Sequence, residues 1–183
     1  MYIIESEIRH PDALVNISDQ NGRIVNFFIN DIGSKKFLEH TKIQVQSEEG
    51  YNKDNILKTD FFGSALGIPV FSTNAKEVLE TKLKDEIVFY ECDLLFKGGD
   101  IKCFLGKIIK SLTIISEEKS RFRISSTGSK FLIKPIVKQD IKEEFFIAKD
   151  IEYPTYFYVS EKFKKIIEDS FLKMNFKLME RSD

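Results

Sequence analysis

The sequence predicts an α+β fold: a strand-rich single domain with two similar strand-Ser-helix-strand units. Its apolar segments are mostly short, rich in Ile, Val, Phe and Tyr, and separated by turn residues, which is typical of strands. Two segments have clear helical spacing, and each directly follows a serine. No Pro- or Gly-rich linker divides the chain, so we expect one domain that covers residues 1–183.

Eight segments have the composition of β-strands. They are YIIESEI (2–8), GRIVNFFIN (22–30), TKIQVQ (41–46), EIVFYECDLLF (86–96), IKCFLGKII (101–109), RFRISS (121–126), KFLIKPIV (130–137) and EFFIA (144–148). Gly, Asn, Asp or Ser residues separate them, as expected where the chain turns between strands. We expect these segments to supply most of the sheet structure.

The two cysteines flank an expected hairpin. Cys92 and Cys103 lie on either side of "KGGD", and the pair Gly98-Gly99 is a turn signal between two apolar runs. A turn centred on this pair places Cys103 opposite Leu94, so the two cysteines become diagonal neighbours about 7 to 8 Å apart, beyond disulfide range. We therefore expect two reduced, structural thiols.

Helical spacing is clearest at residues 73–83 and 161–172. Ser72 and Ser160 precede these segments, and a serine at this position accepts a hydrogen bond from a free N–H of the first helical turn. The expected buried positions repeat at the same offsets: Ala75, Val78, Leu79 and Leu83 in the first segment, and Phe163, Ile166, Ile167 and Phe171 in the second. Ser34 is expected to cap a third, shorter turn.

Two longer stretches, LKTDFFGSALGIPVFSTNAKEVLE and FFIAKDIEYPTYFYVSEKFKKIIEDSFLKMNF, contain the elements of a known family. The elements are Asp-Phe-Phe at residues 60–62, an apolar strand followed by Ser and a helix, a YEC strand, and Phe-Ile-Ala-Lys-Asp before the closing helix. In them the chain resembles the bacterial immunity proteins that protect against polymorphic toxins, the eleventh such family, formerly a domain of unknown function. The resemblance covers roughly residues 55–178 and departs at Ser116, where the family pattern has an acid. It implies a family-like core at residues 55–180 after a variable, strand-rich part at 1–54.

The resemblance also implies a function. Such a protein binds and neutralises a cognate toxin domain by stoichiometric protein–protein association, and it needs no cofactor and no turnover. The N-terminus carries Glu5, Glu7 and Asp12 where a secretory signal needs a basic start and an apolar stretch, so we expect a cytoplasmic protein. There is no apolar run long enough for a membrane span, and the net charge of -1 does not favour nucleic acid or acidic membranes.

An uncharacterised enzyme is one alternative. The only histidines, His10 and His40, fit neither a metal pattern nor a catalytic triad with Cys92 and Cys103. No Gly-x-Ser-x-Gly elbow surrounds the capping serines, and paired carboxylates in the sequence are typical of solvated loops. We therefore expect no catalytic, cofactor-binding or metal-binding residues.

A nucleic-acid-binding module is the second alternative. The segment 119–134 interleaves basic and aromatic side chains, as a surface for phosphates and stacked bases requires. They are Lys119, Arg121, Phe122, Arg123, Lys130, Phe131 and Lys134. Alternation on a strand also places the arginines on one face and Phe122 on the other, which is the pattern of an ordinary half-buried strand.

The loop "QSEEGYNKDN" is the expected partner-binding segment. Glu48, Glu49 and Asp54 surround Tyr51 in a polar region outside the family-like core. An aromatic side chain within a charged rim is typical of protein interfaces, and acidic groups suit a cationic cleft on a toxin that acts on nucleic acid. We expect these four residues to contact the toxin.

Overall fold

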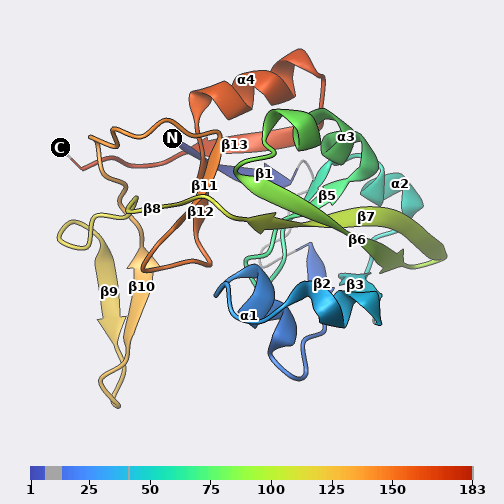
Figure 1. Cartoon of the computed structure of the whole chain (residues 1–183), viewed down its shortest axis with the longest axis horizontal. Helices are drawn as coiled ribbons and strands as arrows, with labels where there is room; N and C mark the ends of the chain where they lie inside the picture. Colours follow the sequence, from blue (N-terminus) through green and yellow to red (C-terminus); the bar gives the residue numbers. More distant parts are fainter. Residues whose placement is uncertain (7–13, 41, 183) are drawn as a thin grey trace.

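The computed structural model describes residues 1–6, 14–40 and 42–182, and Figure 1 shows its sheets, its helices and a separate hairpin. The helices are α1 (Arg23–Phe28), the 3-10 helix η1 (Lys35–Glu39), α2 (Lys53–Ile56), α3 (Thr73–Lys82) and α4 (Glu161–Asp169). The strands are β1 (Tyr2–Ser6), β2 (Val15–Ile17), β3 (Ile43–Ser47), β4 (Phe61–Phe62), β5 (Val70–Ser72), β6 (Ile87–Phe96), β7 (Gly99–Ile108), β8 (Ser111–Leu112), β9 (Arg121–Ile124), β10 (Lys130–Lys134), β11 (Ile147–Asp150), β12 (Phe157–Val159) and β13 (Met174–Leu178). The α+β prediction is confirmed.

The strands form two larger sheets and one isolated pair. The six-stranded sheet has the order β2-β3-β6-β7-β5-β4, and the five-stranded sheet has the order β13-β1-β12-β11-β8. Strands β9 and β10 pair only with each other and project from the body of the protein in Figure 1. Both ends of the chain contribute to the five-stranded sheet, because β1 lies between β13 and β12.

The two predicted strand-Ser-helix-strand units have the same topology. In the first unit, β5 and β6 are each antiparallel to β7, which lies between them, so they run parallel to each other. In the second unit, β12 and β13 flank β1 in the same way. A helix connects the two parallel strands in each case, and the apolar sides of α3 and α4 meet in one buried cluster. The repeated sequence pattern therefore encodes a repeated split β-α-β unit.

Both predicted serine caps are confirmed. The Ser72 hydroxyl accepts a hydrogen bond from the Ala75 N–H at 3.1 Å, and the Ser160 hydroxyl accepts one from the Phe163 N–H at 3.3 Å. Ser34 caps η1 by accepting from the Lys36 N–H at 3.3 Å. These bonds satisfy donors that a helix start leaves without an internal partner, which explains why each helix begins where its serine predicts.

The predicted buried face of α4 is wrong at its last position. Phe171 is 91% exposed, whereas Leu83 at the matching position of the first unit is buried. The helix ends at Asp169, and Phe171 adopts a left-handed conformation with φ 54°. Helical spacing no longer applies beyond that point, so the Phe171 ring does not reach the core.

The segment 22–30, predicted as a strand, contains helix α1. The two carboxylate oxygens of Asp19 accept hydrogen bonds from the N–H groups of Ile24 (3.1 Å) and Val25 (2.8 Å), and Gly22 supplies the left-handed residue at the helix start with φ 67°. The β-branched and aromatic composition suggested a strand. A side-chain cap and burial of one helical face outweigh that local preference.

The predicted hairpin of Cys92 and Cys103 is confirmed, but its register is wrong. Phe96 pairs with Gly99, so the turn is Lys97-Gly98, with Gly98 at φ 99°, and Cys92 lies directly opposite Cys103. Both thiols are free and buried. Burial raises the pKa of the Cys103 thiol to about 12, and it also raises the pKa of the Cys92 thiol, which disfavours the reactive thiolate.

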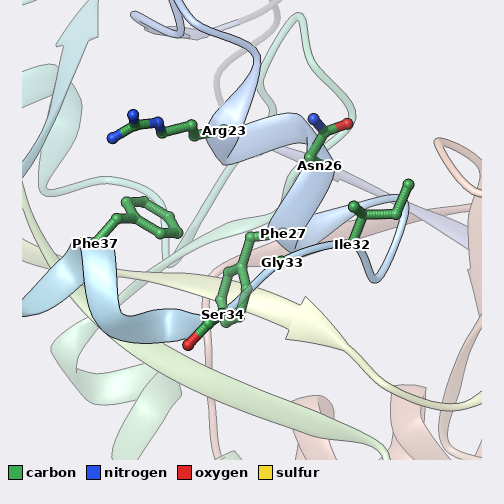
Figure 2. A pocket seen from close by; sticks show the side chains of 7 residues that line it. All are labelled: Arg23, Asn26, Phe27, Ile32, Gly33, Ser34 and Phe37. Carbon is green, nitrogen blue, oxygen red and sulfur yellow. The ribbon is translucent and has the colours of Figure 1, made fainter.

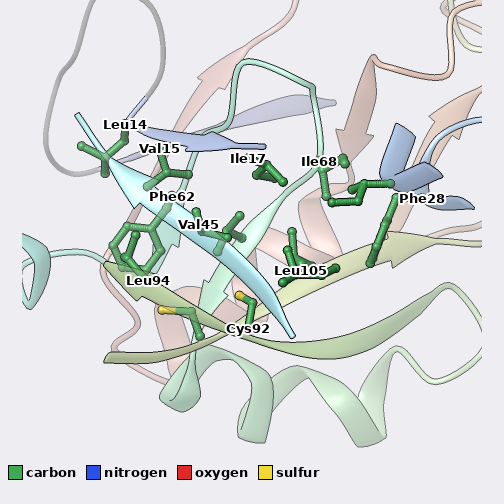
Figure 3. Close-up of a cluster of buried hydrophobic side chains, with 14 of the residues drawn as sticks. Leu14, Val15, Ile17, Phe28, Val45, Phe62, Ile68, Cys92, Leu94 and Leu105 are labelled. Atoms are coloured by element: carbon green, nitrogen blue, oxygen red, sulfur yellow. The ribbon is translucent and has the colours of Figure 1, made fainter. Parts of the chain in front are cut away.

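Three clusters of buried side chains fill the fold. The cluster in Figure 3 packs α1 against the six-stranded sheet through residues such as Phe28, Val45 and Leu105. The shared cluster of α3 and α4 lies on one face of the five-stranded sheet, and alternation along β11 places Ile147 in it but Ala148 in the third cluster, on the opposite face. Residues Glu7 and Ile8 of the first expected strand, His10 and Thr41 lie outside the described residues.

Candidate partner-binding surfaces

The Asp-Phe-Phe motif joins the two split β-α-β units. Asp60 is buried, and its carboxylate accepts one hydrogen bond from the Ser72 hydroxyl and another from the Lys173 N–H at 2.8 Å. Its backbone N–H and carbonyl bond to the Lys173 carbonyl and the Ser72 N–H. Phe61 and Phe62 point into two different buried clusters. The motif therefore connects the cap of α3 to the chain that enters β13, and it is structural.

The Lys-Asp pair that ends β11 is also structural. Asp150 accepts hydrogen bonds from the Ile114 and Ile115 N–H groups, both at 2.8 Å. Lys149 is only 3% exposed and donates to the Ile29 carbonyl at 2.8 Å and to Asp31 at 2.6 Å. Burial by itself would raise the pKa of Asp31, but hydrogen bonds from Lys149 and from Lys107 hold that pKa below its ordinary value.

The predicted partner-binding loop is only partly exposed. Glu48 accepts a hydrogen bond from the Asn16 side chain, and Tyr51 is half-buried against the cluster under the six-stranded sheet. Glu49 and Asp54 are exposed, with Asp54 in the first turn of α2. Two of the four predicted residues thus stabilise the loop itself, and two carboxylates face solvent.

A concave surface that the sequence did not predict lies between α1 and η1. Its hollow has a volume of about 270 Å³, and Figure 2 shows the side chains that line it. Among them, the rings of Phe27 and Phe37 lie edge to face with their centroids 5.6 Å apart. A second hollow of about 320 Å³ shares the lining residues Arg23 and Phe37 with the first, and a third of about 540 Å³ shares Lys42 with the second. The charged residues that line the three hollows are of both signs, so the surface favours no single ligand class. The spacing of Ile24, Phe27 and Phe28 was the signal for α1, but their strand-like composition concealed it.

The hairpin arm, residues 121–134 with strands β9 and β10, is firmly attached at its base. The Tyr153 hydroxyl donates to Glu117 at 2.7 Å, and Lys130 pairs with the same carboxylate at 3.1 Å. The hydrogen bond from Tyr153 and the charge of Lys130 lower the pKa of Glu117, and the bond to Glu117 raises the pKa of Tyr153 to about 12. The Ser120 hydroxyl accepts from the Ile136 N–H at 2.9 Å, which closes the base of the hairpin.

The tip of the hairpin arm is also ordered by hydrogen bonds. The Ser125 N–H donates to the Ser129 carbonyl at 2.9 Å, and the Ser129 N–H donates to the Ser125 hydroxyl at 3.0 Å. Gly128 adopts φ 85°, a conformation that L side chains rarely take, and so permits the tight turn. The arm is therefore hydrogen-bonded at both its base and its tip.

The described parts of the chain contain neither a metal-binding cluster nor a membrane-spanning helix. No group of three or more His, Cys, Asp or Glu residues is placed to hold a metal ion within residues 1–6, 14–40 and 42–182. His40 lines the hollow of about 540 Å³ and is exposed. Over the same ranges, no helix combines the length and the apolar character that a bilayer span requires.

Comparison with known proteins identifies the family. No curated protein matches the sequence at a significant level. The sequence profile of the immunity protein family Imm11, in contrast, matches residues 4–178, which includes the Asp-Phe-Phe motif, both capped helices and the closing strand β13. The chain belongs to the immunity protein family Imm11.

Proposed function

We propose that the chain is an immunity protein that binds one cognate bacterial toxin domain in the cytoplasm and blocks it stoichiometrically, without turnover or a cofactor. Membership of Imm11 over residues 4–178 carries the proposal. The structure supports it indirectly, because the family motif residues Asp60, Lys149 and Asp150 are committed to hydrogen bonds inside the fold. Recognition of a particular toxin then falls to exposed residues outside these motifs.

The exposed carboxylates of the 48–54 loop are proposed to assist the encounter with the toxin. Glu49 and Asp54 have no ion pair among the described residues, so their charge is available to attract a cationic surface. Charges at the rim of an interface mainly change the association rate. Glu48 and Tyr51 are proposed to hold the loop in place, since they contact Asn16 and the core.

Co-expression with the toxin encoded beside this gene tests the function. The protein should restore growth of cells that produce this toxin domain and should not protect against an unrelated toxin, because specificity depends on a particular complementary surface. The purified pair should form a one-to-one complex in light scattering after gel filtration. Absence of any complex, or turnover of a substrate by the protein alone, would contradict the proposal.

Association kinetics test the loop separately. Glu49→Gln combined with Asp54→Asn should slow association roughly 3-fold or more at low salt while leaving dissociation nearly unchanged. The matched control is Glu77→Gln combined with Asp85→Asn, which removes two exposed carboxylates near α3. Equal association rates for the two double variants would remove the loop from recognition and leave the immunity proposal intact.

A further inference from the structure

The hairpin arm presents a different set of side chains on each face. Pairing of Arg123 with Phe131 and of Arg121 with Lys134 places these four side chains on one face, here called the outer face. Ile133 lies at the bulge beside it. Phe131 is 53% exposed and Ile133 is 59% exposed, so both present apolar surface to water.

Much of the opposite, inner face of the arm is occupied by contacts within the protein, although Ile124 on that face is 72% exposed. Lys130 lies 3.9 Å from the centre of the Phe122 ring, and the Tyr153 ring lies 5.9 Å from it. Leu132 packs against the third buried cluster, and its carbonyl accepts a hydrogen bond from the Tyr156 hydroxyl at 3.4 Å. The inner face supplies most of the contacts that attach the arm, and the outer face adds one ion pair, from Lys134 to Glu180.

The arm and the two residues that precede it differ in charge from the remaining chain. Residues 119–134 contain five basic side chains and no acidic one. The whole chain has a net charge of -1, so the residues outside this segment carry a net charge of -6. Lys130 and Lys134 pair with Glu117 and Glu180, whereas Arg121 and Arg123 have no ion pair among the described residues. The outer face therefore favours an acidic partner.

The side chains favour a protein over a nucleic acid as that partner. Single-stranded nucleic acids bind to several exposed aromatic rings on which bases stack. On the arm only the Phe131 ring is exposed, because Lys130 and Tyr153 cover Phe122. Ile133 offers aliphatic surface, which does not stack with bases. Arginine beside an aromatic ring is, in contrast, a common combination at the centres of protein interfaces.

We propose that the outer face of the hairpin arm docks against an acidic, partly apolar surface of the cognate toxin domain, which rests on the function proposed above. Phe131 and Ile133 enter an apolar depression, and Arg121 and Arg123 pair with carboxylates around it. The arm is held by Tyr153 and Ser120 before binding, so little conformational entropy is lost when the complex forms.

Binding of the toxin domain encoded beside this gene, measured by surface plasmon resonance, tests the arm. Arg121→Ser combined with Arg123→Ser should raise Kd at least about 10-fold, with the larger effect at low salt. Phe131→Ser combined with Ile133→Ser should raise Kd about 30-fold or more, mainly through faster dissociation. All four side chains are exposed, so thermal unfolding should be nearly unchanged.

Matched controls separate the arm from general effects of charge and surface hydrophobicity. Lys84→Ser combined with Lys165→Ser removes two exposed charges that have no ion pair among the described residues, and Leu178→Ser removes an exposed apolar side chain from β13. Both controls should bind the toxin within about 2-fold of the unchanged protein.

Each outcome of these measurements has a distinct meaning. If the unchanged protein binds the toxin and the arm variants bind it equally well, the arm proposal is overturned and the immunity function stays in place. Failure of the unchanged protein to bind the toxin would overturn the function and the arm's partner together. A third outcome would assign the arm to nucleic acid instead: the unchanged protein binds a 12-nucleotide single-stranded DNA in a salt-sensitive way, and the arginine variant alone loses this binding while it still binds the toxin.

Discussion

The two split β-α-β units start in the same way and end differently. Each has an apolar strand, a serine cap and a helix that leads to a second parallel strand, with a third strand inserted between them. The first unit receives its middle strand from the adjacent β7, and the second receives it from β1 at the start of the chain. Helix α3 closes with the buried Leu83, whereas α4 closes before the exposed Phe171.

The difference shows that helix starts and helix ends follow different rules in this protein. Ser72 and Ser160 set the starts by local hydrogen bonds, so equal sequences give equal structures. The end of α4 is a Schellman motif, in which the Leu172 N–H bonds to the Ile167 carbonyl and the Phe171 N–H to the Glu168 carbonyl. This end suits a chain that must turn sharply into β13.

Asp60 links the two units, and its substitution should lower the stability of the protein more than any other change proposed here. Asp60→Ala leaves the Lys173 N–H and the Ser72 hydroxyl without their charged acceptor, and we expect a loss of about 4 kcal/mol in the free energy of unfolding. Chemical denaturation measures it. Asp60→Asn keeps one acceptor oxygen and should lose less than half as much; equal losses would show that charge, rather than hydrogen bonding, joins the units.

Substitution at the fourth repeated apolar position, Leu83 in the first unit and Phe171 in the second, should give the clearest difference in stability between the units. Leu83→Ala should lower the free energy of unfolding by about 3 kcal/mol, because it leaves a cavity in the shared cluster. Phe171→Ala should change it by less than about 0.5 kcal/mol, since the ring is already in water. A large loss from Phe171→Ala in urea denaturation would mean that the ring packs in solution and that the units end alike.

Removal of the two serine caps should cost different amounts of stability, because only Ser72 also contacts Asp60. Ser160→Ala should cost about 1 kcal/mol, the usual value for a lost cap. Ser72→Ala should cost about 2 kcal/mol, because it also removes a donor to a buried carboxylate. Equal unfolding midpoints for the two variants would show that the hydrogen bond to Asp60 adds no stability, and an unchanged midpoint for Ser160→Ala would contradict its role as a cap.

A substitution at the end of α4 should give the smallest change in stability, and this change should be a gain. Phe171→Gly places the residue that best tolerates φ 54° at this position, and we expect an increase of about 1 kcal/mol or less. Glycine at the matching position of the first unit, Leu83→Gly, should instead be destabilising, because the φ of Leu83 is negative and its side chain is buried. Thermal unfolding of both variants gives the comparison.

Local sequence determined much of the fold. The α+β class, the caps at Ser72 and Ser160, and the hairpin of β6 and β7 follow from hydrogen bonds and alternation over a few residues, which need no knowledge of distant segments. The family resemblance also came from short motifs, whose residues are structural. For the same reason these motifs did not indicate where a partner binds.

Tertiary structure decided the remaining features. It made α1 a helix, since burial of one helical face, added to the local hydrogen bonds from Asp19, outweighed strand propensity. It set the hairpin register, because one more residue on either side of a glycine turn is equally allowed locally and only packing selects between them. It also placed Glu48 and Tyr51 against the fold and the outer face of the hairpin arm in solvent, because exposure depends on contacts between residues far apart in the sequence.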